Sequence, residues 1–182
     1  MPLNENSTEQ NGLETVVCAY CHTGNEAQCA AIINGRTDVQ AVVPMRIRRD
    51  KEKNGWVDKS VKLFPSYLFL YASGEDALQK IQAAVRDRHM AIVTYGDGTR
   101  TLRGEDLEFA RWIRQHGGVI GISSAVREGE SIRIVEGALA QMRGTVRKVD
   151  RRHKLVQIEL EINGFTTWLS YDWVDRMEEE KA

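Results

Sequence analysis

The final third of the chain is the part of the sequence that most constrains the fold. Between Val126 and Met177, short β-type runs alternate with turn residues such as Glu136-Gly137 and Asn163-Gly164. An Asn-Gly pair between two alternating runs is a strong signal for a tight hairpin. Four or five short strands in roughly 50 residues are expected to close into a small β-barrel, because closure removes exposed strand edges.

The first two thirds of the chain contain both the two-residue apolar alternation of strands and the 3.6-residue apolar spacing of helices. Asn54-Gly55 marks a hairpin tip inside the basic stretch Arg46–Lys62. The hairpin and the strands and helices around it form a mixed order of elements, which predicts an α+β sandwich with helices packed on one sheet. Apolar spacing predicts strands over 15–21, 39–47, 63–72 and 90–95, and helices over 25–33, 74–88 and 105–116.

Small, flexible residues from Gly117 to Ser124 separate the two patterns and predict a linker. The expected organisation is then a two-domain chain with short tails. Its parts are a disordered tail over 1–13, a mixed domain over 14–116, a linker over 117–125, a β-barrel domain over 126–177 and a charged tail over 178–182.

The charge of the chain is balanced overall and concentrated locally. A net charge of −1 argues against indiscriminate binding to nucleic acid, so a nucleic-acid site must be a local patch. The stretch Arg147–Lys154 holds five Lys or Arg in eight positions. It is either a solvated hairpin loop or a contact for phosphates, and double-stranded RNA is read mainly through shape, phosphate and 2′-OH. A second basic patch comprises Arg46, Arg48, Arg49 and Lys51. It too is either a solvated surface or a contact for phosphates.

The sequence has no pattern of catalytic or metal-binding residues, and we expect neither an enzyme nor a cofactor. Cys18-Ala19-Tyr20-Cys21-His22 matches the C-x-x-C-H pattern of haem attachment, but that chemistry needs export, and the N-terminus is not a secretory signal. Cys18 and Cys21 lie three apart in a predicted strand and so face opposite sides. With no apolar run long enough to span a membrane, a cytoplasmic chain with reduced cysteines is expected.

The predicted strand over 63–72 is apolar on both faces. By the period of two, Tyr67, Phe69 and Tyr71 share one face. A sheet covered by helices on one side needs only one apolar face. The other face is therefore predicted to be either core or an exposed apolar patch for a partner helix.

The motifs, in this order and spacing, resemble the NusG family of transcription elongation factors over residues of about 14–177. The first part resembles an NGN domain through Tyr20-Cys21-His22-Thr23-Gly24-Asn25-Glu26 and the F-P-x-Y strand that starts at Phe64. The second part resembles a KOW domain through Gly129-Glu130, Val135–Ala138 and Gly144-Thr145-Val146. Ser66 and Gly137-Ala138-Leu139 depart from the pattern of the general family. The stretch Leu63–Leu70 and the Tyr20-Cys21 pair are more similar to the specialised paralogues typified by RfaH, and the basic KOW turn is similar to that of the paralogue LoaP.

The resemblance implies a monomeric antitermination factor that binds the clamp helices of RNA polymerase and suppresses pausing and termination. Structured nascent RNA is an implied partner, and non-template DNA is a further one. Polymerase-binding residues carried over from the family are Tyr20, Phe64, Pro65, Tyr67 and Phe69. The expected RNA-binding residues are Arg143, Arg147, Lys148, Arg151, Arg152 and Lys154.

Two other functions stay open from the sequence. One is a general elongation factor whose KOW domain binds proteins, and the other is an RNA-binding module unrelated to polymerase. Because 155–162 (LVQIELEI) alternates as a half-buried strand does, β-structure is the expected resting state of the KOW-like part.

Overall fold

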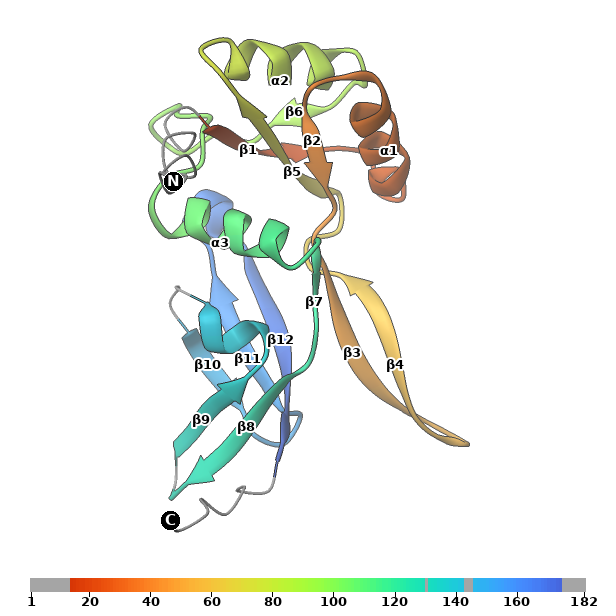
Figure 1. The fold of residues 1–182 in the computed structure, drawn as a ribbon, viewed down its shortest axis with the longest axis vertical. Helices are drawn as coiled ribbons and strands as arrows, with labels where there is room; N and C mark the ends of the chain where they lie inside the picture. The colour runs from red at the N-terminus through yellow and green to blue at the C-terminus, as the bar shows by residue number, and fades with distance from the viewer. Residues whose placement is uncertain (1–13, 130, 143–145, 175–182) are drawn as a thin grey trace, which may run out of the picture. The chain divides into compact units, whose positions relative to one another are not determined.

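The computed structural model describes residues 14–129, 131–142 and 146–174, and its fold is α+β (Figure 1). The described residues form two compact units, and the chain passes between them more than once. The first unit comprises the described parts of Met1–Val43 and Pro65–Arg103, and the second those of Pro44–Phe64 and Gly104–Ala182. No helix in these ranges is long and apolar enough to cross a membrane.

The first unit is a four-stranded sheet with two helices. The strands lie in the order β2-β5-β1-β6, and β1 pairs antiparallel with β5 along its whole length. Its elements are β1 (Glu14–Tyr20), α1 (Glu26–Arg36), β2 (Gln40–Val42), β5 (Tyr67–Ser73), α2 (Ala77–Arg86) and β6 (Ala91–Ile92).

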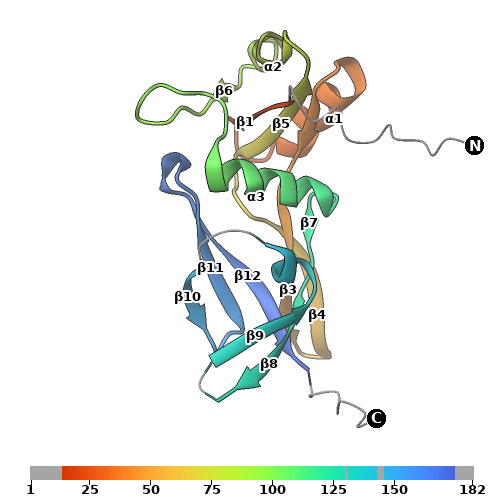
Figure 2. The ribbon, with the colours of Figure 1, turned by 60° about the vertical axis from the view of Figure 1, so that its left-hand side comes forward.

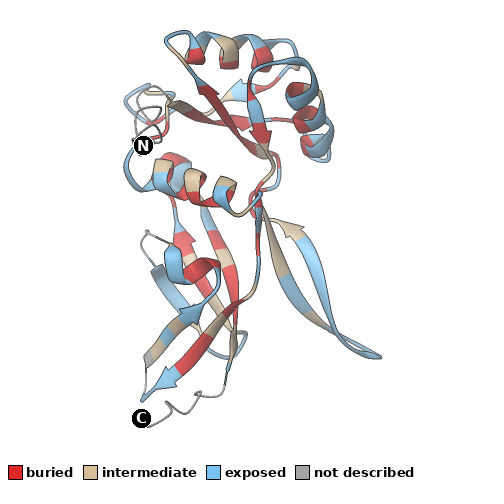
Figure 3. Cartoon of the chain, in the orientation of Figure 1, coloured by how far each residue is buried: buried red, intermediate tan, exposed pale blue. Residues whose placement is uncertain are grey.

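Both helices of the first unit pack into one hydrophobic cluster with alternate residues of β1 and β5, including Val17, Leu68 and Leu70. Figure 3 shows the buried positions of these strands. The predicted strand over 15–21 is confirmed, as is the predicted separation of the two cysteines. Cys21 belongs to this cluster and Cys18 does not.

Helix α1 confirms the predicted helix over 25–33 and extends it to Arg36. Asn25 is its N-cap, and its buried positions are Glu26, Cys29, Ala30 and Ile33. Ala27 and Ala31 are exposed, because each follows a buried position by one residue, a turn of about 100° on a helix. Glu26 is fully buried because its carboxylate accepts the N–H groups of Gly24 and Ser66 at 2.9 and 2.8 Å. Sequence reasoning did not single out this carboxylate, because glutamate side chains are almost never fully buried unless they are paired.

Proline divides the predicted strand over 39–47. Residues 40–42 form β2 in the first unit, and the chain resumes as β3 (Met45–Glu52) in the second unit after Pro44. Pro44 has no N–H to donate to a ladder, so the strand ends before it. The predicted hairpin tip at Asn54-Gly55 is confirmed, because β3 pairs antiparallel with β4 (Gly55–Lys62).

The second unit contains the hairpin, one helix and a five-stranded sheet. The short strand β7 (Val119–Ile120), which lies in the predicted linker, pairs parallel with β3. The five-stranded sheet runs β10-β11-β12-β8-β9 and is strongly curved (Figure 2). Its elements are α3 (Gly104–Gln115), β8 (Ser123–Glu128), β9 (Ser131–Glu136), β10 (Val146–Asp150), β11 (Leu155–Glu159) and β12 (Thr166–Trp173), with 3₁₀ turns at η1 (Ala138–Gln141) and η2 (Ile162–Gly164).

The predicted closed barrel is an open sheet in the described residues, because no ladder there joins the edge strands β9 and β10. The predicted turns around it are confirmed. Asn163 and Gly164 both have positive φ and connect β11 to β12. Gly137 has φ 93°, and a Cβ at this position would lie 2.9 Å from the Cα of Ser123. Only glycine fits this close approach.

Helix α3 belongs to the same compact unit as the C-terminal strands. The Asp106 carboxylate accepts the N–H groups of Glu161 and Ile162 at 2.8 and 2.7 Å. The Trp112 indole N–H donates to the carbonyl oxygen of Ala138 at 3.0 Å. The second compact unit includes Pro44–Phe64 and helix α3 as well as the C-terminal strands, so its bounds differ from those of the predicted KOW-like domain. The NGN-like and KOW-like domains stay predictions.

Candidate nucleic-acid interface

The turn between β10 and β11 carries half of the six predicted RNA-binding residues, namely Arg151, Arg152 and Lys154. Asp150 holds this turn, because its carboxylate accepts the backbone N–H of His153 at 2.9 Å and lies 2.8 Å from the His153 Nδ1. These contacts with His153 keep the pKa of Asp150 below its usual range. The turn places Arg151 and Arg152 in solvent.

The other predicted cations fall into different surroundings. Arg147 is exposed on β10 and pairs with Glu159 at 2.8 Å, while its neighbour Lys148 is exposed without an ion pair in the described residues. Lys154, the last residue of the turn before β11, pairs with Asp172 of β12. Arg143 lies outside the described residues.

The second basic patch, on β3, is held by carboxylates. Arg48 binds Asp50 through two nitrogens, each 2.8 Å from a carboxylate oxygen. Arg49 binds Asp58 at 2.7 Å and Asp172 at 2.8 Å. The hydrogen bonds from Arg48 hold the pKa of Asp50 below its usual range, and those from Arg49 do the same for Asp58.

Asp172 connects the two basic patches, because its carboxylate forms ion pairs with both Arg49 and Lys154. Burial alone would raise the pKa of Asp172. The hydrogen bonds from Lys154 and from the Trp173 N–H outweigh burial, so the pKa is lowered. The carboxylate is therefore charged at neutral pH and holds the hairpin strand β3 against β12.

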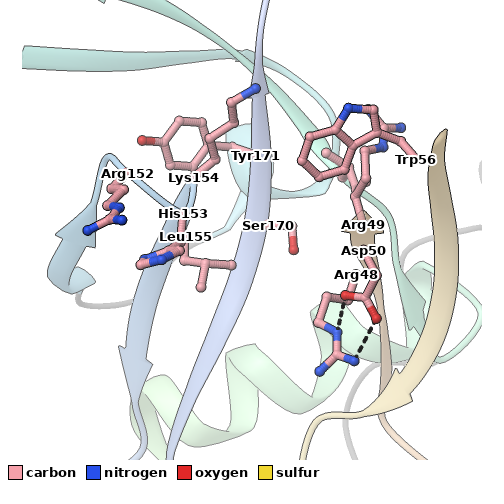
Figure 4. A pocket seen from close by; sticks show the side chains of 11 residues that line it. Arg48, Arg49, Asp50, Trp56, Arg152, His153, Lys154, Leu155, Ser170 and Tyr171 are labelled. Atoms are coloured by element: carbon pink, nitrogen blue, oxygen red, sulfur yellow. Dashed lines mark hydrogen bonds and ion pairs between the residues drawn. The ribbon is translucent and has the colours of Figure 1, made fainter. Parts of the chain in front are cut away.

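A pocket of about 490 Å³ lies where the two patches meet (Figure 4). Strands β3 and β4 supply one wall, and the β10–β11 turn with β11 and β12 supplies the other. Its lining residues are Arg48, Arg49, Asp50, Trp56, Ile122, Arg152, His153, Lys154, Leu155, Ser170 and Tyr171.

Trp56 is the most exposed large apolar residue of this pocket, and sequence reasoning did not predict it as a site residue. It follows the hairpin tip directly and is 66% exposed, the largest exposure among the big apolar side chains of the described residues. Figure 4 shows its indole directed from β4 into the pocket. The signal was present in the sequence, since a tryptophan beside an Asn-Gly tip in a basic hairpin has no core to enter.

Two of the predicted polymerase-binding residues form an aromatic pair on neighbouring strands of the first unit. The Tyr20 and Tyr67 rings meet edge to face with centroids 5.6 Å apart, and Tyr20 is 42% exposed. Tyr67 is partly exposed, and its burial raises the pKa of its hydroxyl. Pro65 is also exposed.

The other two lie in the interior. Phe69 is buried on β5, and Phe64 is buried in the second unit, where it stacks on Phe165 with centroids 5.5 Å apart. Tyr71 is buried as well. The alternative that this aromatic face forms an exposed apolar patch is therefore wrong for Phe69 and Tyr71, and only its Tyr20–Tyr67 end reaches solvent.

No group of His, Cys, Asp and Glu in the described ranges is arranged to hold a metal ion. The three cysteines are buried free thiols.

No family model and no curated protein matches this chain. A solved structure described as "Domain interaction in Thermotoga maritima NusG" is similar to it at 17% sequence identity with a TM-score of 0.45. That match covers 86% of this chain and 92% of that chain. A likeness this weak does not establish a family.

Proposed function

We propose that the chain is a NusG-like transcription factor that binds nucleic acid through the second unit and RNA polymerase through the Tyr20–Tyr67 end of the first. The observation that carries the proposal is the joining of the two basic patches around one pocket with an exposed tryptophan. Cations beside an exposed aromatic ring are the combination that nucleic-acid surfaces use.

The cations favour nucleic acid even though many are paired. Arg147, outside the pocket, has an exposed ion pair with Glu159 that contributes only about 0–1 kcal/mol, so a phosphate can replace Glu159 there at small cost. Lys148 and Arg152 have no ion pair in the described part of the chain and can bind phosphate directly. Structured nascent RNA is the partner we favour, and non-template DNA would use the same phosphate contacts.

The polymerase part of the proposal rests on the sequence motifs. Tyr20, Pro65 and Tyr67 present exposed or partly exposed surface in the first unit and could pack on the clamp helices. Binding across the polymerase would favour its closed state over the open state that precedes termination. A factor of this kind acts by shifting conformational populations and needs no covalent chemistry. We place the chain in the cytoplasm with the specialised antitermination paralogues.

The general elongation factor and the polymerase-independent RNA module remain as rivals. Run-off transcription through an intrinsic terminator separates them, with and without the protein and with and without its upstream leader. We expect read-through to increase only when both protein and leader are present. An equal effect on every template would favour the general factor.

Tyr67→Asp is expected to abolish co-purification with RNA polymerase and to remove the read-through, because it places a charge in the aromatic contact. Its RNA affinity should stay unchanged, since Tyr67 lies in the first unit. Thr15→Asp on β1, partly exposed at the far end of the same ladder, is the matched control and should retain polymerase binding. Normal co-purification of Tyr67→Asp would contradict the polymerase contact.

A further inference from the structure

We infer that the pocket between the β3–β4 hairpin and strands β11–β12 takes an unpaired base of a single-stranded RNA segment, stacked on the Trp56 indole. The inference rests on the proposed RNA binding and narrows it. The sequence alone favoured duplex RNA read by shape, whereas the pocket requires a base that has left its stack.

The size and lining of the pocket fit a flat, mostly apolar ligand. Its volume of about 490 Å³ falls within the roughly 300–1,000 Å³ of small-ligand pockets. The apolar side chains Trp56, Ile122 and Leu155 come from three different elements or connections. Ser170 adds a hydroxyl that accepts an N–H from Arg46 at 3.4 Å and still has its own proton to donate to a base.

The electrostatics of the lining favour a base over a phosphate inside the pocket. Arg48 and Arg49 are bound by carboxylates, and Lys154 is bound by Asp172. The charged Asp50 is itself part of the lining and would repel a phosphate placed beside it. A neutral base meets no such repulsion.

The phosphates of the same strand have cations outside the pocket. Arg152 lines the rim, and Lys148 is exposed on β10, the strand that leads into the same turn. A base inside a duplex keeps both faces covered by its neighbours, so it cannot stack on Trp56. Single-stranded loops and ends expose their bases for this contact, which is how aromatic side chains select unpaired RNA.

The test uses the full chain with a dodecameric single-stranded RNA that carries one central 2-aminopurine, and with the duplex of that RNA. Binding to the single strand should quench the 2-aminopurine fluorescence. Trp56→Ala should weaken this binding by about 5- to 150-fold, the effect of losing one base–aromatic stack, and should abolish the quenching. Trp56→Phe should retain most of both. Binding to the duplex should not change.

Val57→Ala is the matched control, because Val57 is the exposed neighbour on the same strand. Trp56 is itself exposed, so its replacement leaves the core intact and the melting temperature should match that of the control. Unchanged affinity and quenching in Trp56→Ala, with an RNA-binding wild type, would overturn the base pocket and leave the proposed function standing. Failure of the wild type to bind either RNA would overturn both.

Discussion

Replacing Asp106 with Ala is expected to lower the free energy of unfolding of the second unit by about 2–4 kcal/mol. Asp106 is 1% exposed, and its two carboxylate oxygens accept the N–H groups of Glu161 and Ile162. Without the carboxylate these donors lose their acceptors. A buried donor left without a partner costs about 1–3 kcal/mol.

Urea unfolding measures the global effect, and hydrogen exchange at the amides of Glu161 and Ile162 measures the local one. Asp106→Asn keeps one acceptor oxygen and should fall between the wild type and Ala. Glu105→Ala makes the same change of charge at the exposed neighbour on α3 and should cost less than about 0.5 kcal/mol. Equal stability of Asp106→Ala and Glu105→Ala would show that these hydrogen bonds do not hold α3 to the β11–β12 turn.

Replacing Phe64 with Ala is expected to destabilise the second unit by about 3–5 kcal/mol. The ring is 6% exposed, stacks on Phe165 and meets Phe109 edge to face with centroids 6.2 Å apart. Removing it leaves a cavity between these two rings. Phe64→Leu should lose less, and Pro65→Ala, at the exposed neighbour, should stay close to the wild type in thermal and urea unfolding.

This result bears on the carried-over polymerase site. The resemblance assigns Phe64 to the polymerase contact, yet its ring is packed inside the second unit. Loss of polymerase binding in Phe64→Ala would therefore reflect the loss of packing. A variant that unfolds like the wild type and still fails to bind polymerase would instead show that Phe64 contacts polymerase directly.

The elements of the fold were largely predictable because their signals are local. Asn54-Gly55 and Asn163-Gly164 fixed two hairpin connections, and both are present. The predicted helix over 74–88 contains α2, whose Ile81 and Val85 are buried in the core. Pro44 lies inside the strand predicted over 39–47, and no local pattern shows that it separates two sheets.

Long-range contacts were the part that local patterns could not predict. The Asp106 carboxylate accepts N–H groups from residues more than fifty positions away, which no local pattern in the sequence indicates. The two basic patches were predicted separately, and neither pattern contains the position of Asp172 that joins them. Trp56 was overlooked for the same reason. Its place in a binding pocket is evident only once the residues of the opposite wall are known.

The salt dependence of RNA binding is the most direct measurement of the central claim, that the second unit binds RNA through phosphate contacts. In a titration of a structured leader hairpin, log Kd should change linearly with log salt concentration. Arg151→Ala with Arg152→Ala should weaken binding and reduce the slope by about 1–2. Arg36→Ala with Arg86→Ala, the same change of charge on the helices of the first unit, should change neither. Unchanged affinity and slope in the Arg151/Arg152 variant would contradict the claim.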